Sequence, residues 1–203
     1  MENIINTFET GDIILFSNNY SLWDITTWPS FIVEYFSNSK YSHIGMILKD
    51  PTWLNKKLTG IYLWESVPDN TIDPQDNKKK LGVKLTPITE IFKSKTEKLF
   101  LRKLINKKNK LNPEVLQKIH ESVYDKPYDL NIIDWIDVYY KIQLNKPTID
   151  RFFCSAFIGF IYYQSNIINK NINWDLLKPE DFAPEGKYII WNNTFLGDLI
   201  PLN

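Results

Sequence analysis

The stretch CSAFIGFIYYQS, residues 154–165, constrains the fold most strongly, because almost every position in it is apolar. A helix that is apolar all round must be buried against other elements. The apolar run that contains most of it, residues 152–163, spans roughly a dozen residues, whereas a helix that crosses a membrane needs about 20. The sequence therefore predicts a buried core helix and no transmembrane segment.

The part of the chain before residue 105 predicts a β-sheet, because short apolar runs alternate there with turn residues. In YSHIGMIL, residues 41–48, every second residue from Ile44 is apolar, as in a strand with one face in a core. Residues 68–80 are rich in Asp, Asn and Lys, and we expect them to form a long loop. Strands are expected at residues 11–16, 41–49, 60–67, 81–88 and 98–104.

Helical patterns dominate the second half of the chain. Asn112 is a suitable N-cap, Pro113 fits a first helical turn, and Glu114 complements the positive end of the helix dipole. Besides the buried helix, helices are expected at residues 28–38, 113–124 and 132–144.

The C-terminal part predicts a loop in LKPEDFAP, residues 177–184, and a late strand in KYIIW, residues 187–191. No repeat and no low-complexity linker interrupts the chain. We therefore expect one α+β domain over residues 1–203.

The composition excludes several classes of protein. The chain has 203 residues, 43% of them hydrophobic, which is enough for a real core and too apolar for a disordered chain. Because 24 Lys and Arg residues match 24 Asp and Glu residues, no net charge attracts nucleic acid or an anionic membrane. The single cysteine, Cys154, cannot form an intrachain disulfide, which fits a reducing compartment. The N-terminal residues lack the apolar stretch of a signal peptide, so we expect a cytoplasmic location.

Three residues are candidates for catalysis. If residues 41–49 and 60–67 form a hairpin in which paired residue numbers sum to about 108, His43 lies opposite Glu65 on one face. A carboxylate beside an imidazole fixes the ring and stabilises its charged form. Cys154 begins the buried helix, where the helix dipole and free N–H groups favour a thiolate. Together they predict a Cys-His-acid arrangement for nucleophilic catalysis.

Each of these residues also has a plain structural interpretation. A lone cysteine in an apolar helix is usually a small buried hydrophobe, and a lone strand histidine is more often a core or surface residue. Glu65 alone fits a solvated strand end. The other histidine, His120, is expected in mid-helix facing solvent. One Cys and two His without close spacing are a poor metal signature, so no metal or cofactor is expected.

At this point the chain resembles a known family. GDIILF, YSHIGMIL, IYLWES, GVKLTPI and FCSAF, in this order, look like the permuted NlpC-like branch of papain-fold cysteine hydrolases, with bacterial and poxvirus-type members. In that branch the histidine strand precedes the cysteine helix. The segment LKPEDFAP is similar to a late family motif, with Phe182 in place of the usual leucine.

The resemblance implies a papain-like, circularly permuted α+β fold in which an antiparallel sheet packs against the cysteine-bearing helix. It implies Cys154 as nucleophile, His43 as base and Glu65 as the third catalytic residue. Tyr41, two residues before the histidine, would share its strand face and line the substrate site; packing is its alternative role. Asp12 matches a structural Gly-Asp turn, and Asp129 lies in a segment that precedes the site.

The expected activity is a thiol hydrolase or acyltransferase acting on an amide or ester bond. An aromatic segment, residues 20–36, would suit a lipid or lipid-modified substrate and contact with a membrane surface if exposed near Cys154. Ordinary core packing is the alternative explanation of these aromatics. A peptidase or amidase on peptide substrates, and a binding module on the same scaffold, remain alternatives. The oligomeric state is left open. The aromatic residues are Trp23, Trp28, Phe31, Tyr35 and Phe36.

Overall fold

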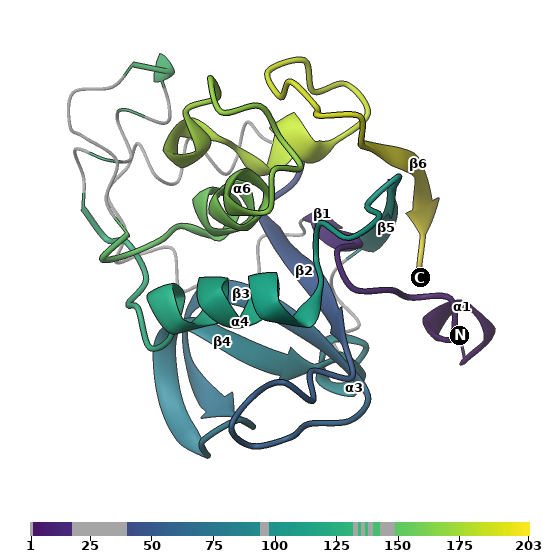
Figure 1. Cartoon of the computed structure of the whole chain (residues 1–203), viewed down its shortest axis with the longest axis vertical. Coiled ribbons are helices and arrows are strands. Elements are labelled where there is room, and N and C mark those ends of the chain that lie inside the picture. Colours follow the sequence, from purple (N-terminus) through teal and green to yellow (C-terminus); the bar gives the residue numbers. More distant parts are fainter. Residues whose placement is uncertain are drawn as a thin grey trace.

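Six strands form one antiparallel sheet within the residues that the structure describes, in the order β4-β3-β2-β1-β5-β6 (Figure 1). This computed structural model describes residues 2–17, 40–93, 98–131, 134, 137, 140–142 and 149–203. The chain therefore has the expected α+β class. The strands are β1 (Ile13–Ser17), β2 (His43–Lys49), β3 (Ile61–Asp73), β4 (Lys78–Pro87), β5 (Lys98–Ile105) and β6 (Phe195–Pro201).

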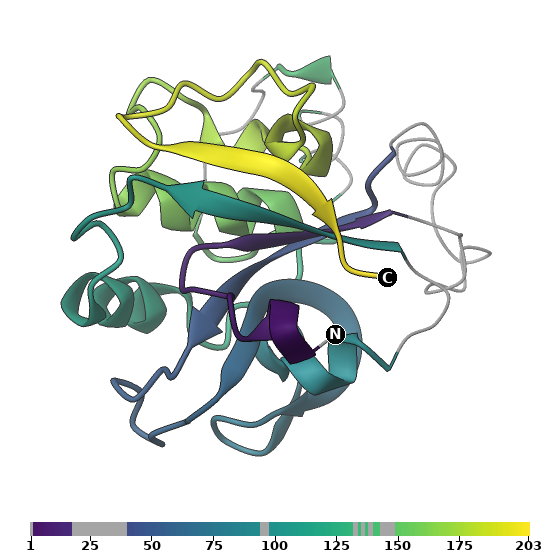
Figure 2. The ribbon, with the colours of Figure 1, turned by 90° about the vertical axis from the view of Figure 1, so that its right-hand side faces the viewer.

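The helices lie on both sides of this sheet (Figures 1 and 2). The helix α6 packs on β2 and β3. The predicted helix at 28–38 and the aromatic segment 20–36 lie outside the described residues, as does most of 132–144. The helices are α1 (Glu2–Ile5), α3 (Ile88–Ile91), α4 (Pro113–Val123) and α6 (Cys154–Gln164), with 3-10 turns at Trp174–Leu176 and Pro179–Phe182.

The alternation of β2 divides its side chains between two hydrophobic clusters. Ile44, Met46 and Leu48 are buried in the larger cluster, which also contains the apolar residues of α6 and α4. Ile47 is buried in the smaller cluster, together with residues of β1, β5 and the α1 and α3 regions. His43 lies four residues before Ile47, so the strand pattern directs it toward the face of the smaller cluster.

The β2–β3 register differs from the predicted one by two residues. Met46 pairs with Trp64 and Lys49 with Ile61, so that paired numbers sum to 110. A shift of two residues keeps every side chain on its face, because strands have a period of two. The paired region ends at Met46 and Trp64. Beyond it, Ser66 Oγ of β3 donates a hydrogen bond to the Phe152 carbonyl at 2.8 Å, which anchors the segment leading into α6.

The predicted loop at 68–80 is wrong, because β3 and β4 continue through it as a long hairpin. The register shifts between Val67 and Thr71, where the two strands bend. The sequence does not indicate this hairpin, because its residues are mostly polar. Its end is held by ion pairs rather than by apolar alternation: the buried Lys80 ammonium lies 3.1 Å from Asp73 and 3.0 Å from Asp76.

The predicted late strand at 187–191 is also wrong. Trp191 makes only an isolated bridge to Ile168, and the last strand is β6, which pairs with β5. The predicted loop at 177–184 contains the short 3-10 turn Pro179–Phe182. The other predicted strands and the helices α4 and α6 are present. Among the helices described, none is both long and apolar enough to cross a membrane.

Candidate active site

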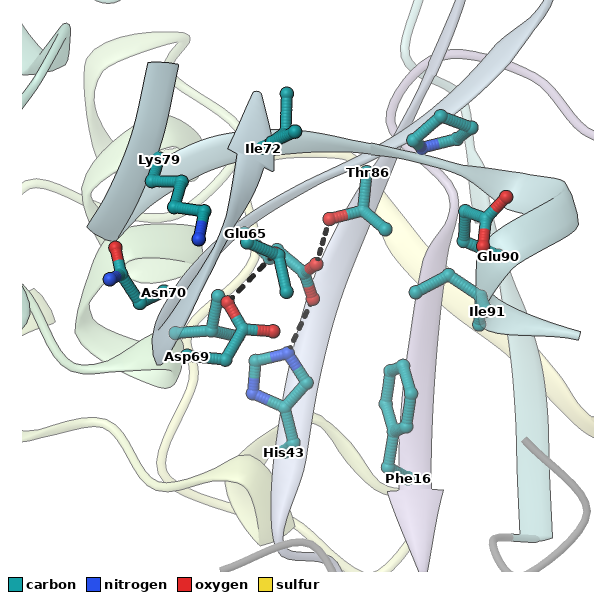
Figure 3. Close-up of a pocket in the computed structure, with 13 residues that line it drawn as sticks. Phe16, His43, Glu65, Asp69, Asn70, Ile72, Lys79, Thr86, Glu90 and Ile91 are labelled. Carbon is teal, nitrogen blue, oxygen red and sulfur yellow. Dashed lines mark hydrogen bonds and ion pairs between the residues drawn. The ribbon is translucent and has the colours of Figure 1, made fainter. Parts of the chain in front are cut away.

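A buried imidazole–carboxylate pair lies at the start of β2. His43 Nε2 donates a hydrogen bond to Glu65 Oε2 at 2.7 Å, and the two side chains are 9% and 4% exposed (Figure 3). The expected contact between these residues is therefore present. It is diagonal across the sheet, because the observed register places Gly45 rather than His43 in line with Glu65.

The second carboxylate oxygen of Glu65 is also held in place. Thr86 Oγ1 of β4 donates a hydrogen bond to Glu65 Oε1 at 2.5 Å. On the imidazole side, the Phe16 ring of β1 meets the His43 ring edge-on, with 4.9 Å between centroids. The carboxylate thus has a fixed orientation, and the imidazole has one apolar wall. Our sequence analysis missed Thr86; a strand threonine facing the site from β4 gives no motif of its own.

Cys154 is the first residue of α6 and is buried. The first backbone hydrogen bond of the helix runs from Phe157 N–H to the Phe153 carbonyl. The N–H groups at the start of α6 therefore precede the helical ladder, and the side chain of the N-cap residue, Phe153, makes no capping hydrogen bond to them. A thiol at this position lies at the positive end of the helix dipole.

Cys154 and His43 interact although their strand and helix belong to different layers, since the thiol is one of the groups that shift the pKa of His43. Burial of the imidazole opposes its protonation, but hydrogen bonds and charge interactions with Cys154 and Glu65 outweigh it and raise the pKa of His43 to about 10. Since Nε2 is bonded to Glu65, Nδ1 is the ring nitrogen left for the thiol. The site thus favours an imidazolium between two acidic groups.

Residues 128 and 129, just before the helix predicted at 132–144, also lie near the thiol. Tyr128 forms a parallel bridge with Phe152, and burial followed by the charge of Cys154 raises the pKa of its phenol well above its usual value. Next to it, burial raises the pKa of Asp129 to about 6, while Arg151, 3.1 Å away, opposes the rise. Tyr128 is therefore near enough to the cysteine to interact with its charge, and Asp129 follows it in the chain.

Tyr41 does not take the place predicted for it. The strand β2 begins at His43, so Tyr41 precedes it and does not follow its alternation. The tyrosine is 1% exposed in the larger cluster, and its ring meets Phe100 edge-on. It is absent from the residues that line the cavity beside His43. Tyr41 packs in the core.

His120 does not face solvent as predicted. It lies on α4 among the rings of Trp53, Trp64 and Tyr124, and its Nε2 donates to Gln75 Oε1 at 2.7 Å. Burial and the nearby Lys80 ammonium lower the pKa of His120 to about 4. This imidazole is therefore neutral and structural, because it joins α4 to the β3–β4 hairpin.

Asp12 has the structural role expected of it. Its two carboxylate oxygens accept hydrogen bonds from the backbone N–H groups of Glu9 and Leu104, at 3.0 and 3.1 Å. It fixes the turn that leads into β1 against β5. Among the described residues, no group of three His, Cys, Asp or Glu side chains is placed to hold a metal ion.

A cavity of about 600 Å³ adjoins the imidazole–carboxylate pair. This volume is in the range of small-molecule sites. The pair forms part of its wall, so a bound molecule would contact His43 and Glu65, whereas Cys154 is not among the lining residues (Figure 3). The lining residues belong to β1, β2, the β3–β4 hairpin and α3.

Comparisons with known proteins add no family to these observations. No protein-family model matches the chain, and no curated protein matches it.

Proposed function

We propose that this chain is a cysteine-dependent hydrolase or acyltransferase that cleaves an amide or ester bond. The observation that carries the proposal is the buried pair of His43 and Glu65, 2.7 Å apart, whose imidazole interacts with the thiol that begins α6. A nucleophile, a base and an orienting carboxylate are the groups that acyl transfer through a thioester requires. The same residues support, as part of the proposal, a papain-like permuted fold.

In the first half of the proposed reaction, the Cys154 thiolate attacks the substrate carbonyl carbon, and the carbonyl electrons move to oxygen. The free N–H groups at the start of α6 stabilise that oxyanion. When the tetrahedral intermediate collapses, the bond to the amine or alcohol breaks, and the leaving group takes the proton from His43. A thioester on Cys154 remains.

In the second half, neutral His43 removes a proton from water or from another acceptor, which attacks the thioester. The thiolate leaves, and the imidazolium is restored beside it. Glu65 keeps its hydrogen bond to Nε2 throughout, so the ring holds the orientation in which Nδ1 faces the sulfur and the acceptor. Thr86 keeps the carboxylate in place.

Alkylation of Cys154 with iodoacetamide tests the proposal. A thiolate held by an imidazolium reacts well below the pH of about 8.5 at which an ordinary thiol ionises. We expect wild-type labelling to persist at pH 6, and labelling of the His43→Ala variant to follow the pH dependence of a free thiol. If both proteins follow the free-thiol curve, the catalytic proposal fails and a binding module on this scaffold is favoured.

The substrate class is a separate part of the proposal. An amide or ester bond in a lipid or lipid-modified molecule is our first candidate, and a peptide is the alternative. Lipid profiles of cells that contain the active protein or the Cys154→Ala variant distinguish them. Unchanged lipids with a changed peptide pool would reverse the order of the two candidates.

A further inference from the structure

The cavity beside the imidazole–carboxylate pair has two unlike sides (Figure 3). One side, the polar side, comes from the β3–β4 hairpin and carries Asp69, Asn70 and Lys79, with the apolar Val67 and Ile72 beside them. The other side carries Phe16 of β1 and Ile91 of α3. The catalytic pair lies between the two sides, so a molecule that fills the cavity meets both.

The polar side carries one positive charge, that of Lys79, without a negative partner among the described residues. The carboxylate of Asp69 is bonded to the ammonium of Lys84, a side chain that is 1% exposed. On the other side of the cavity, Glu90 is paired with Lys93 at 2.7 Å. The side chain of Lys79, in contrast, has no hydrogen bond or ion pair to any residue of the described ranges.

The side chain of Asn70, beside Lys79, is likewise without a hydrogen-bond partner within the described part of the chain. Its amide N–H groups and the Lys79 ammonium are donors on the same side of the cavity (Figure 3). An ammonium and an amide that are not used by the protein suit a carboxylate or a phosphate.

The imidazole of His43 connects the cavity to the nucleophile, because it lines the cavity and also interacts with the Cys154 thiol. His43 turns Nε2 to Glu65, and its other ring nitrogen points toward the side of Asp69 (Figure 3). That nitrogen is the one left for the Cys154 thiol. A group bound by Lys79 would therefore lie on the side of the cavity toward which this ring nitrogen points, and an apolar group against Phe16 and Ile91 would lie on the opposite side.

We propose that Lys79 and Asn70 bind an anionic group of the substrate, a carboxylate or a phosphate, while Phe16 and Ile91 contact an apolar part of the same molecule. This inference rests on the proposed function, because it assigns the substrate of that site. It makes the β3–β4 hairpin, which sequence analysis took for a loop, the element that selects the substrate.

Probes of matched length test the inference. Each is a chloroacetamide on an alkyl chain that ends in a carboxylate, a phosphonate or a neutral amide; the Cys154 thiolate forms a carbon–sulfur bond and chloride leaves. The measurement is the second-order rate of labelling by intact-protein mass. We expect the better of the two anionic probes to label about fivefold faster than the amide, as for a partly exposed ion pair. The faster of the carboxylate and phosphonate probes shows which kind of anion the site prefers.

The variants identify the source of this preference. Lys79→Gln should abolish the preference for the anionic probe, and Lys79→Arg should keep it. Lys78→Gln makes the same charge change at a neighbour that does not line the cavity, so this control should also keep the preference. Equal rates for charged and neutral probes in the wild type, or a preference that survives Lys79→Gln, overturn the inference.

The two proposals fail separately in this experiment. The catalytic proposal depends on the labelling rate at low pH with the neutral probe and on its loss in His43→Ala. The substrate inference depends only on the ratio between two probes on the same protein. A reactive thiol with a ratio of one rejects the anion site alone, and an ordinary thiol with a ratio that depends on Lys79 rejects catalysis alone.

Discussion

His43 bonds to the Glu65 carboxylate through Nε2 and also interacts with the Cys154 thiol, and both partners favour the charged ring. Burial alone would keep the imidazole neutral, as it does for His120. The pKa values of the two histidines are therefore shifted in opposite directions. His43 has acidic partners inside the protein, whereas His120 has aromatic neighbours and a lysine.

The Glu65→Gln variant should separate these effects. The amide keeps a hydrogen bond to Nε2 but removes the negative charge, so the pKa of His43, about 10 in the wild type, should fall by about 1 to 3 pH units. Histidine ring nitrogen NMR across pH measures this directly. His120, with a pKa of about 4, serves as the internal control and should not change. A wild-type His43 that titrates near 6.5 would contradict the expectation that its two acidic partners stabilise the imidazolium.

At this scale the sequence predicted much of the candidate site. Residue order and strand parity were enough to bring His43 and Glu65 to one face, because a register error of two residues leaves parity unchanged. They were not enough for Tyr41, since parity applies only within the strand and β2 begins after it. Thr86 was missed because a hydrogen bond between neighbouring strands has no local sequence pattern.

Among the elements, α4 was the one best specified by local signals. Asn112 caps it: the side-chain oxygen accepts the Val115 N–H at 2.9 Å, and Pro113 occupies the first turn. The Asn112→Ala variant should lower the free energy of unfolding by about 1 kcal/mol, because the N–H group loses its acceptor. Urea denaturation measures the change. Asn112→Asp retains an acceptor and should stay near wild type; equal losses in both variants would mean that the cap is not the cause.

Elements without a local signal were the ones predicted wrongly. The β3–β4 hairpin extends through residues whose partners are charges, such as Lys80 with Asp73 and Asp76, and no apolar alternation marks it. For the last strand, the apolar run 187–191 was a stronger sequence signal than residues 195–201. Residues 195–201 form the last strand because they pair with β5, and such pairing depends on the whole sheet.

On the scale of the whole molecule, the candidate site lies where the sheet opens. The β2–β3 pairing ends at Met46 and Trp64, and the segment before α6 bonds to Ser66 just beyond. This opening allows Cys154, on the helix side, to reach an imidazole whose strand position faces the other way. The site therefore depends on the packing of α6 on the sheet, and the sheet in turn is joined to α4 through His120 and the hairpin.

The two histidines also predict how the stability of the whole molecule depends on pH. The folded-state pKa of His43 lies above 6.5, so its contribution is fully present below about pH 6.5 and is lost as the pH rises toward 10. The folded-state pKa of His120 lies below 6.5, so protons favour the unfolded chain and stability falls as the pH drops from 6.5 toward 4. As far as these two residues decide it, stability should be greatest near pH 6.5.

The His120→Gln variant tests the acid side of this profile. Between pH 6 and pH 4.5, His120 should contribute a loss that approaches 1.4 kcal/mol per pH unit, and the variant should lack it. Asp129, whose pKa is raised to about 6 by burial, acts in the opposite direction over this range and is present in both proteins, so it cancels in the comparison. The measurement is the free energy of unfolding in urea at several pH values. The glutamine also loses ring contacts, which lowers stability at every pH, so the slope is compared and not the absolute value. Parallel slopes in the two proteins would show that His120 is not a buried neutral imidazole, and that α4 and the hairpin are not joined in the way the structure describes.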